Sequence, residues 1–111
     1  MQYKLNPAIT EKELRDYGFT DFSNGHWYYY QIMYNEYRWH MSFNLDVLKS
    51  NYNHIEIDII DDITGKVFNF KYMTDVKKKD RTVRRMKRAY DKIIKKLLND
   101  EILLEGNNEQ S

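Results

Sequence analysis

The stretch DRTVRRMKRAYDKIIKKLL, residues 80–98, decides the fold because it reads as one amphipathic helix. At about 100° per residue, one stripe collects the apolar side chains Val83, Met86, Tyr90, Ile93, Ile94, Leu97 and Leu98. The opposite side collects Arg81, Arg84, Arg85, Arg88, Lys92, Lys95 and Lys96. The apolar stripe needs a surface to pack on, and the preceding residues predict an antiparallel sheet that supplies it.

The predicted helix ends near Asn99–Asp100, because Ile102 and Leu103 would otherwise point toward its basic side. We therefore expect Ile102–Leu104 to form a short extended or separately packed segment. Residues 106–111 are polar and predict a disordered tail, which leaves a single domain over residues 1–105.

Four strands are predicted ahead of this helix: His26–Met33, Glu36–Val47, His54–Asp61 and Lys66–Met73. The second alternates strictly and places on the core side Tyr37, Trp39, Met41, Phe43, Leu45 and Val47. A tight turn at Asn35-Glu36 would pair Tyr28 with Phe43, Tyr30 with Met41, and Ile32 with Trp39. These pairs place Tyr28, Tyr30 and Ile32 against the core.

The third and fourth strands predict a hairpin through the turn Asp62–Gly65. Its core-side pairs are Phe68 with Ile59, Phe70 with Ile57, and Tyr72 with Ile55. The fold class is therefore α+β: a four-stranded antiparallel meander with the long C-terminal helix packed on one face.

A short N-terminal helix is predicted over Glu11–Tyr17. Thr10 and Glu13 fit a capping box, and Gly18 is suited to end the helix. We expect this helix at an end or flank of the sheet.

Composition limits the classes of protein to consider. The chain of 111 residues contains no Cys, which excludes disulfides and thiolate metal sites. No apolar run resembles a signal peptide or a membrane span, so we expect a cytoplasmic protein without membrane contact. No P-loop, dinucleotide fingerprint, nucleophile elbow or zinc spacing is present, so we expect neither an enzyme nor a cofactor.

The net charge of +1 conceals an uneven distribution. Residues 76–96 contain eleven Lys and Arg against two Asp, a net of +9. Residues 1–75 and residues 97–111 each carry a net of −4. The sequence thus predicts a cationic helix mounted on an acidic body.

The basic face of the predicted helix is the first candidate binding surface. Its seven cations suit nucleic-acid phosphates or an acidic protein surface. The alternative is a solvated helix face that binds nothing.

The outer face of the first hairpin is the second candidate. There the predicted register presents Trp27 and Tyr29 beside Arg38 and His40, a combination that stacks bases or anchors a protein interface. The alternatives are self-association through these aromatics, or a cover formed by another segment of the chain.

His54, Glu56 and Asp58 alternate along one strand and share a face. Strand neighbours two apart lie about 6.5–7 Å apart at Cα, which strains joint coordination of one ion. We therefore predict no metal site here.

The layout of the chain resembles small uncharacterised proteins of Firmicute phages and prophages. The resemblance rests on the run TEKELRDYGF at residues 10–19, the WYYY at 27–30, the IDIIDDITG at 57–65 and the closing Lys-rich helix. It covers about residues 8 to 104. It implies an accessory role in a phage-infected cell, which includes inhibitors of host defence nucleases.

Taken together, these features lead us to expect a non-enzymatic binding module that acts by protein–protein contact. A host defence nucleoprotein is one such partner. The alternative is direct binding of nucleic acid through the basic helix face.

Overall fold

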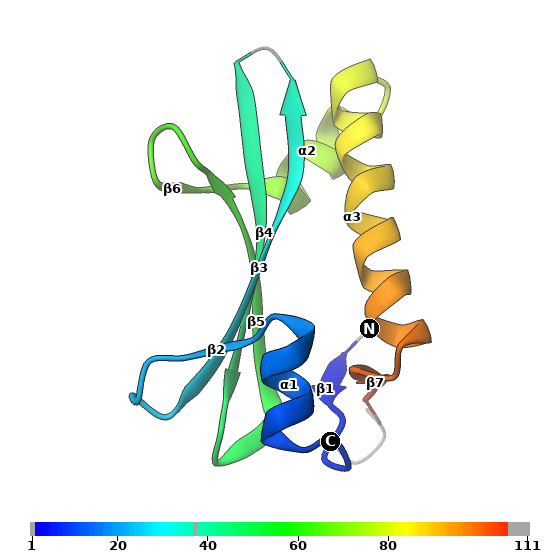
Figure 1. The fold of residues 1–111 in the computed structure, drawn as a ribbon. Coiled ribbons are helices and arrows are strands. Elements are labelled where there is room, and N and C mark those ends of the chain that lie inside the picture. Colours follow the sequence, from blue (N-terminus) through cyan, green and yellow to red (C-terminus); the bar gives the residue numbers. More distant parts are fainter. Residues whose placement is uncertain (1, 37, 107–111) are drawn as a thin grey trace.

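The computed structural model describes residues 2–36 and 38–106 as an α+β fold (Figure 1). A five-stranded antiparallel sheet follows chain order as a meander, β2-β3-β4-β5-β6. Its strands are β2 (Thr20–Asp21), β3 (His26–Glu36), β4 (Trp39–Leu48), β5 (Asn51–Asp61) and β6 (Lys66–Phe68). The predicted meander is confirmed, but the sheet has five strands where four were predicted.

The predicted long helix is α3 (Arg81–Asn99), and Asp80 caps it by accepting a hydrogen bond from Val83 N–H at 3.1 Å. The apolar stripe lies against one face of the sheet, which we call the inner face (Figure 1). Val83, Met86, Ile93, Ile94 and Leu97 are buried, while Tyr90 and Leu98 are partly buried. The helix and its orientation are therefore as predicted.

The β3–β4 register differs from the prediction and reverses the facing of β3. Trp27 pairs with Val47 and Tyr29 with Leu45, so these two aromatics share the inner face with β4's apolar residues. Tyr28 pairs with Asp46 and Tyr30 with Asn44, on the outer face. The turn lies further along the chain, because Glu36 pairs with Trp39, and a bulge between Ile32 and Tyr34 shifts the pairing again. The core-side residue predicted at position 37 lies outside the described residues.

The β5–β6 hairpin is confirmed over its first half. Ile59 pairs with Phe68 as predicted, and Gly65 has φ of 74°, the left-handed region that glycine adopts readily. The strand then stops. Asn69 accepts a hydrogen bond from Tyr72 N–H at 3.1 Å and caps the helix α2 (Phe70–Val76). The predicted pairs of Phe70 and Tyr72 with β5 are therefore wrong.

The N-terminal helix α1 (Glu11–Tyr17) is confirmed with both predicted caps. Thr10 and Glu13 exchange hydrogen bonds between side chain and backbone, which also hold the pKa of Glu13 below its usual range. Gly18, with φ of 128°, ends the helix. Tyr17 donates to Asp100 at 2.8 Å, which ties α1 to the C-terminal end of α3.

Residues near the two ends of the described chain pair in a small second sheet, which the sequence did not predict. It pairs β1 (Tyr3–Leu5) with β7 (Leu103–Glu105). Leu5 and Leu103 are fully buried, and Gly106 N–H donates to Gln2 O at 2.7 Å. The extended segment predicted at Ile102–Leu104 thus exists and adds to the core. The predicted tail lies, from residue 107 on, outside the described residues.

The core occupies only one side of the five-stranded sheet. α1, α3 and the β1–β7 pair all contribute buried residues to the single core cluster on the inner face. None of the described helices lies over the opposite face, which we call the outer face (Figure 1). The molecule therefore offers two separate surfaces, the solvent side of α3 and the outer face of the sheet.

Candidate functional site

The basic face of α3 lies on the solvent side of the helix. All seven predicted residues are exposed: Arg81, Arg84, Arg85, Arg88, Lys92, Lys95 and Lys96. Their position follows from the buried stripe, which leaves the other side of the helix to water. The structure therefore brings together all seven residues of this predicted surface.

Only part of this charge is neutralised within the described residues. Arg85 lies 3.5 Å from Glu36 and Lys96 lies 2.7 Å from Asp100. The hydrogen bond from Lys96 helps hold the pKa of Asp100 below its usual range. For the other five the described part of the chain supplies no ion pair, and we call them the basic stripe: Arg81, Arg84, Arg88, Lys92 and Lys95.

The basic stripe is a continuous line along the helix. Its members are three or four residues apart, so each side chain neighbours the next. From Arg81 to Lys95 the line extends about 21 Å at 1.5 Å per residue. A linear array of this kind presents several cations at once to one partner surface.

A recess of about 300 Å³ opens between α2 and α3, at the N-terminal end of the basic stripe. Its lining combines four basic residues with Thr74 and Val83: Lys78, Arg84, Lys87 and Arg88. Lys87 is paired with Asp91 at 2.7 Å. The recess thus combines apolar side-chain surface with four basic residues, and the sequence did not predict it because α2 was not predicted.

The predicted aromatic surface of Trp27, Tyr29, Arg38 and His40 does not exist as a unit. Trp27 is 1% exposed and lies in the core, and Tyr29 also faces inward. His40 is on the outer face, and Arg38 is exposed in the connection that follows β3. The prediction failed because β3 carries apolar side chains on both faces, so its alternation did not define the register.

Trp27 instead belongs to a tightly paired cluster under β2. The cations of Lys49 and Arg15 lie 4.4 and 5.2 Å from the centre of its ring. Asp21, the cross-strand partner of Trp27, binds Lys49 at 2.5 Å. This hydrogen bond, with a second from Ser23 N–H, holds the pKa of Asp21 below its usual range. The arrangement explains how a tryptophan bordered by charges is stably buried.

The outer face carries a different set of aromatic and aliphatic side chains. Tyr30 and Ile32 are each 56% exposed, and Phe22 packs on Tyr28 with ring centres 5.4 Å apart. His26 stacks on Tyr28 and contacts Asp46 at 2.6 Å. The alternation of Tyr28, Tyr30 and Ile32 in the sequence indicates that they share one face. The prediction that this face is the core side is wrong.

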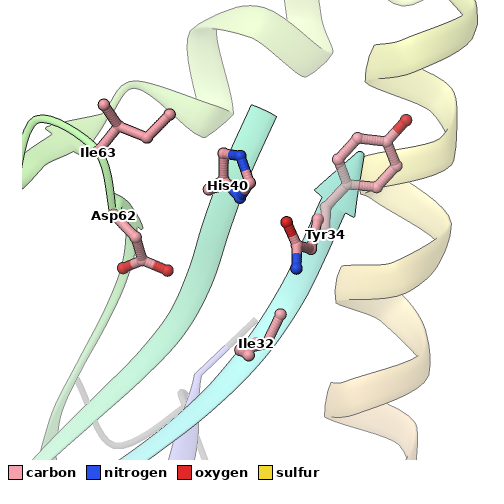
Figure 2. Close-up of a pocket in the computed structure, with 6 residues that line it drawn as sticks. Ile32, Tyr34, His40, Asp62 and Ile63 are labelled. Atoms are coloured by element: carbon pink, nitrogen blue, oxygen red, sulfur yellow. The ribbon is translucent and has the colours of Figure 1, made fainter. Parts of the chain in front are cut away.

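A second recess, of about 260 Å³, lies at the end of the outer face near the β5–β6 turn. It is lined by Ile32, Tyr34, Asn35, His40, Asp62 and Ile63 (Figure 2). His40 comes from β4 and Asp62 from the turn after β5, while the Tyr34 ring points away from them toward α3 (Figure 2). The recess therefore combines two isoleucines with a carboxylate and an imidazole.

His54, Glu56 and Asp58 lie on the outer side of β5, since Ile55, Ile57 and Ile59 face the core. Within residues 2–36 and 38–106 no group of three or more His, Asp or Glu side chains is arranged to hold a metal ion. Likewise, no helix in the described chain has the length and hydropathy that crossing a membrane requires.

No model of a known protein family matches this sequence, and no curated protein matches it either. A solved structure does share the fold: the crystal structure of a DUF1831 family protein, lp2179, from Lactobacillus plantarum. The two superpose with a TM-score of 0.65 over 92% of this chain and 84% of that chain. The sequences are 13% identical, so the similarity concerns the fold alone.

Proposed function

We propose that this protein is a non-enzymatic binding module that docks through the basic face of α3 onto an acidic surface of a partner protein. The observation that supports this proposal is the basic stripe, whose five cations have no ion-pair partner among the described residues. On a helix that is merely solvated, acidic residues are usually interspersed among the basic ones. Here α3 contains a single acidic residue, Asp91, and it pairs with Lys87 outside the basic stripe.

The recess at the end of the basic stripe favours a protein partner over nucleic acid. Its lining includes Val83, Arg84 and Arg88, and long basic side chains offer an apolar stem as well as a charge. An apolar side chain of a partner protein would fill the recess, and Asp or Glu residues beside it would pair with the basic residues of the lining. A phosphate backbone offers charge but no apolar group.

Direct binding of nucleic acid is the second candidate, and the continuity of the basic stripe favours it. Cations at intervals of three and four residues along one helix can contact successive phosphates. The two candidates differ in salt dependence, because phosphate binding releases counterions and weakens steeply as salt rises.

The biological setting that we propose is accessory action in a phage-infected cell, supported by the resemblance in layout to small phage and prophage proteins. In that setting an acidic surface of a host defence nucleoprotein is a suitable partner. Such a module would inhibit by occupying a surface, with no reaction of its own.

Reversal of charge on the basic stripe tests the proposal. We expect the variant Arg84→Glu/Arg88→Glu/Lys92→Glu to remain folded, because all three side chains are exposed and lack ion-pair partners in the described chain. Its recovery of the partner in a pull-down from host lysate, with and without nuclease, should be lost, since attraction becomes repulsion. A gel shift with duplex DNA and RNA at two salt concentrations measures the second candidate.

The matched control reverses three exposed cations outside α3, Lys12, Lys66 and Lys71, and so changes the net charge equally. It should bind as the wild type does. Unchanged partner recovery by the basic-stripe variant would refute the proposal. Loss of binding by both variants would assign the effect to net charge alone. Nuclease-sensitive recovery with a steep salt dependence would replace the protein partner with nucleic acid.

A further inference from the structure

The outer face of the sheet presents its side chains in rows that the strand pairing defines. Tyr28 and Tyr30 belong to β3, and across β4 and β5 the neighbouring positions are largely acidic or amide. The three rows are Tyr28–Asp46–Glu56, Tyr30–Asn44–Asp58 and Ile32–Ser42–Ile60–Val67. Each row thus crosses several strands of the same open surface.

Apart from three histidines, His26, His40 and His54, the charged side chains described on this face carry one sign. Four carboxylates point outward from β4, β5 and the turn after β5: Asp46, Glu56, Asp58 and Asp62. Among the described residues, no outward-facing position of β2 to β6 is a Lys or Arg. The outer face is therefore the electrostatic opposite of the basic face of α3, which lies on the other side of the sheet.

The same face exposes apolar groups beside its carboxylates. Ile32, Ile63 and Val67 are 56%, 63% and 62% exposed, and Tyr30 stands next to Ile32's row. An aromatic ring beside a carboxylate favours a cation, because the ring face and the negative charge of the carboxylate both attract it. Apolar side chains contact the hydrocarbon stem of the same basic side chain. A long, positively charged side chain therefore fits this surface better than a small cation or an anion.

The recess at the end of the outer face contains the carboxylate of Asp62 (Figure 2). Ser42, though on the outer face, is 1% exposed and donates to Asp62 Oδ1 at 2.8 Å. Asn44 in turn donates to Ser42 Oγ at 2.9 Å. In the described residues no hydrogen bond reaches Asp62 Oδ2. That oxygen is free to accept from a bound group in the recess, whose lining also includes Ile32 and Ile63.

We propose that the outer face of the sheet is a second docking surface, which binds a Lys- or Arg-rich segment of a partner protein. One basic side chain of that segment occupies the recess, with its stem between Ile32 and Ile63 and its charge on Asp62. A second copy of this chain is a poorer occupant. If two outer faces packed against each other, their carboxylates would repel. If the outer face bound α3 of another copy, each copy would still have one unoccupied surface, and open-ended chains would form.

Binding of a defined peptide tests this assignment without reference to the basic face of α3. The probe is a short fluorescein-labelled peptide of alternating Lys and Ser, with a Glu–Ser peptide as its counterpart. Fluorescence anisotropy should show binding of the Lys peptide alone. Amide NMR shifts should change at Tyr30, Ile32, Asp58 and Asp62 and not along α3. The variant Asp58→Asn/Asp62→Asn should bind about tenfold more weakly.

Two further variants separate docking from folding and from net charge. Ile32→Lys places a fixed cation at the recess on an exposed side chain, so the protein should fold and yet lose the peptide. Glu11→Gln/Asp16→Asn removes the same two charges from α1 and should leave the affinity unchanged. An equal loss in this control, or shifts confined to other elements, would overturn the proposal. Sedimentation provides a further test. If the mass of the wild type rose with concentration and Ile32→Lys abolished that rise, the outer face would be a self-association surface and the proposal would be overturned.

Discussion

At the scale of single residues, Trp27 shows how tertiary contacts, and not local alternation, decide which face of a strand is buried. The consecutive aromatics Trp27 to Tyr30 place rings on both faces of β3, so the pattern allows either face to be the inner one. On the Trp27 side, Lys49 and Arg15 lie over the ring and both pair with Asp21. The largest side chain of the strand is thereby buried, and Tyr28 next to it points outward.

Truncation of Trp27 measures this arrangement. We expect Trp27→Ala to destabilise the protein by about 3–5 kcal/mol, because a fully buried ring leaves a large cavity. Urea unfolding followed by circular dichroism gives the free energy of unfolding. Tyr30→Ala, on the exposed face of the same strand, is the control and should cost less than about 1 kcal/mol. Similar losses for both variants would mean that the facing of β3 is not as described.

At the scale of elements, β6 and α2 show where a strand pattern gives way to a helix. The alternation of Val67 to Met73 is compatible with a strand, but Asn69 is a favourable N-cap and its side chain accepts from Tyr72 N–H. Phe70 then packs on Tyr90 of α3, with ring centres 5.0 Å apart. A short helix thus places Phe70 against α3 while β6 stays three residues long.

Removal of the α2 cap tests this element. Asn69→Ala should destabilise the protein by about 1 kcal/mol, within the 0.5–2 kcal/mol that N-cap substitutions cost. Lys71→Ala is the matched control and should be near neutral, since its pairing with Asp75 at 3.4 Å is exposed. Thermal unfolding of the two variants beside the wild type gives the comparison. Equal melting temperatures for all three would contradict the capping role of Asn69.

At the scale of the whole molecule, the β1–β7 pair joins the beginning of the described chain to its end. Asn6 N–H donates to Ile102 O at 2.9 Å beyond the paired residues, and Leu5 and Leu103 meet the core from both strands. Because the paired residues are about a hundred positions apart, this closure confers stability only when α3 and the sheet are already in place. It also holds the C-terminal end of α3 near α1.

Substitution within this pair tests the closure. Leu103→Ala should destabilise by about 2–5 kcal/mol, the cost of emptying a fully buried leucine site. Hydrogen exchange of the Asn6 amide, which donates to Ile102 O, should become faster in the same variant, because the two strands open together. Glu105→Ala, on an exposed side chain, should change stability by no more than about 0.5 kcal/mol. Slow exchange retained in the Leu103 variant would show that β1 is held by other contacts.

The sequence by itself determined the elements whose signals are local. The caps of α1, the apolar stripe and basic face of α3, the alternation of β4 and β5, and the turn ending at Gly65 all depend on residues within a few positions of one another. These features follow from hydrogen-bond and side-chain periodicity, which the chain carries before it folds. The basic face of α3 was therefore located correctly, although its role as a binding surface stays a proposal.

Only the tertiary structure decided the facing of β3, the extent of β6 and the pairing of β1 with β7. Each depends on contacts between segments far apart in the chain: Asp21 and Lys49 beside Trp27, Phe70 against Tyr90, and Leu5 with Leu103. A one-residue change of register exchanges the two faces of a strand, so the aromatic and acidic outer face could not be assigned from alternation alone. Which face the core covers is decided by the packing of the whole chain, and that choice left Tyr28, Tyr30 and Ile32 open to solvent or a partner.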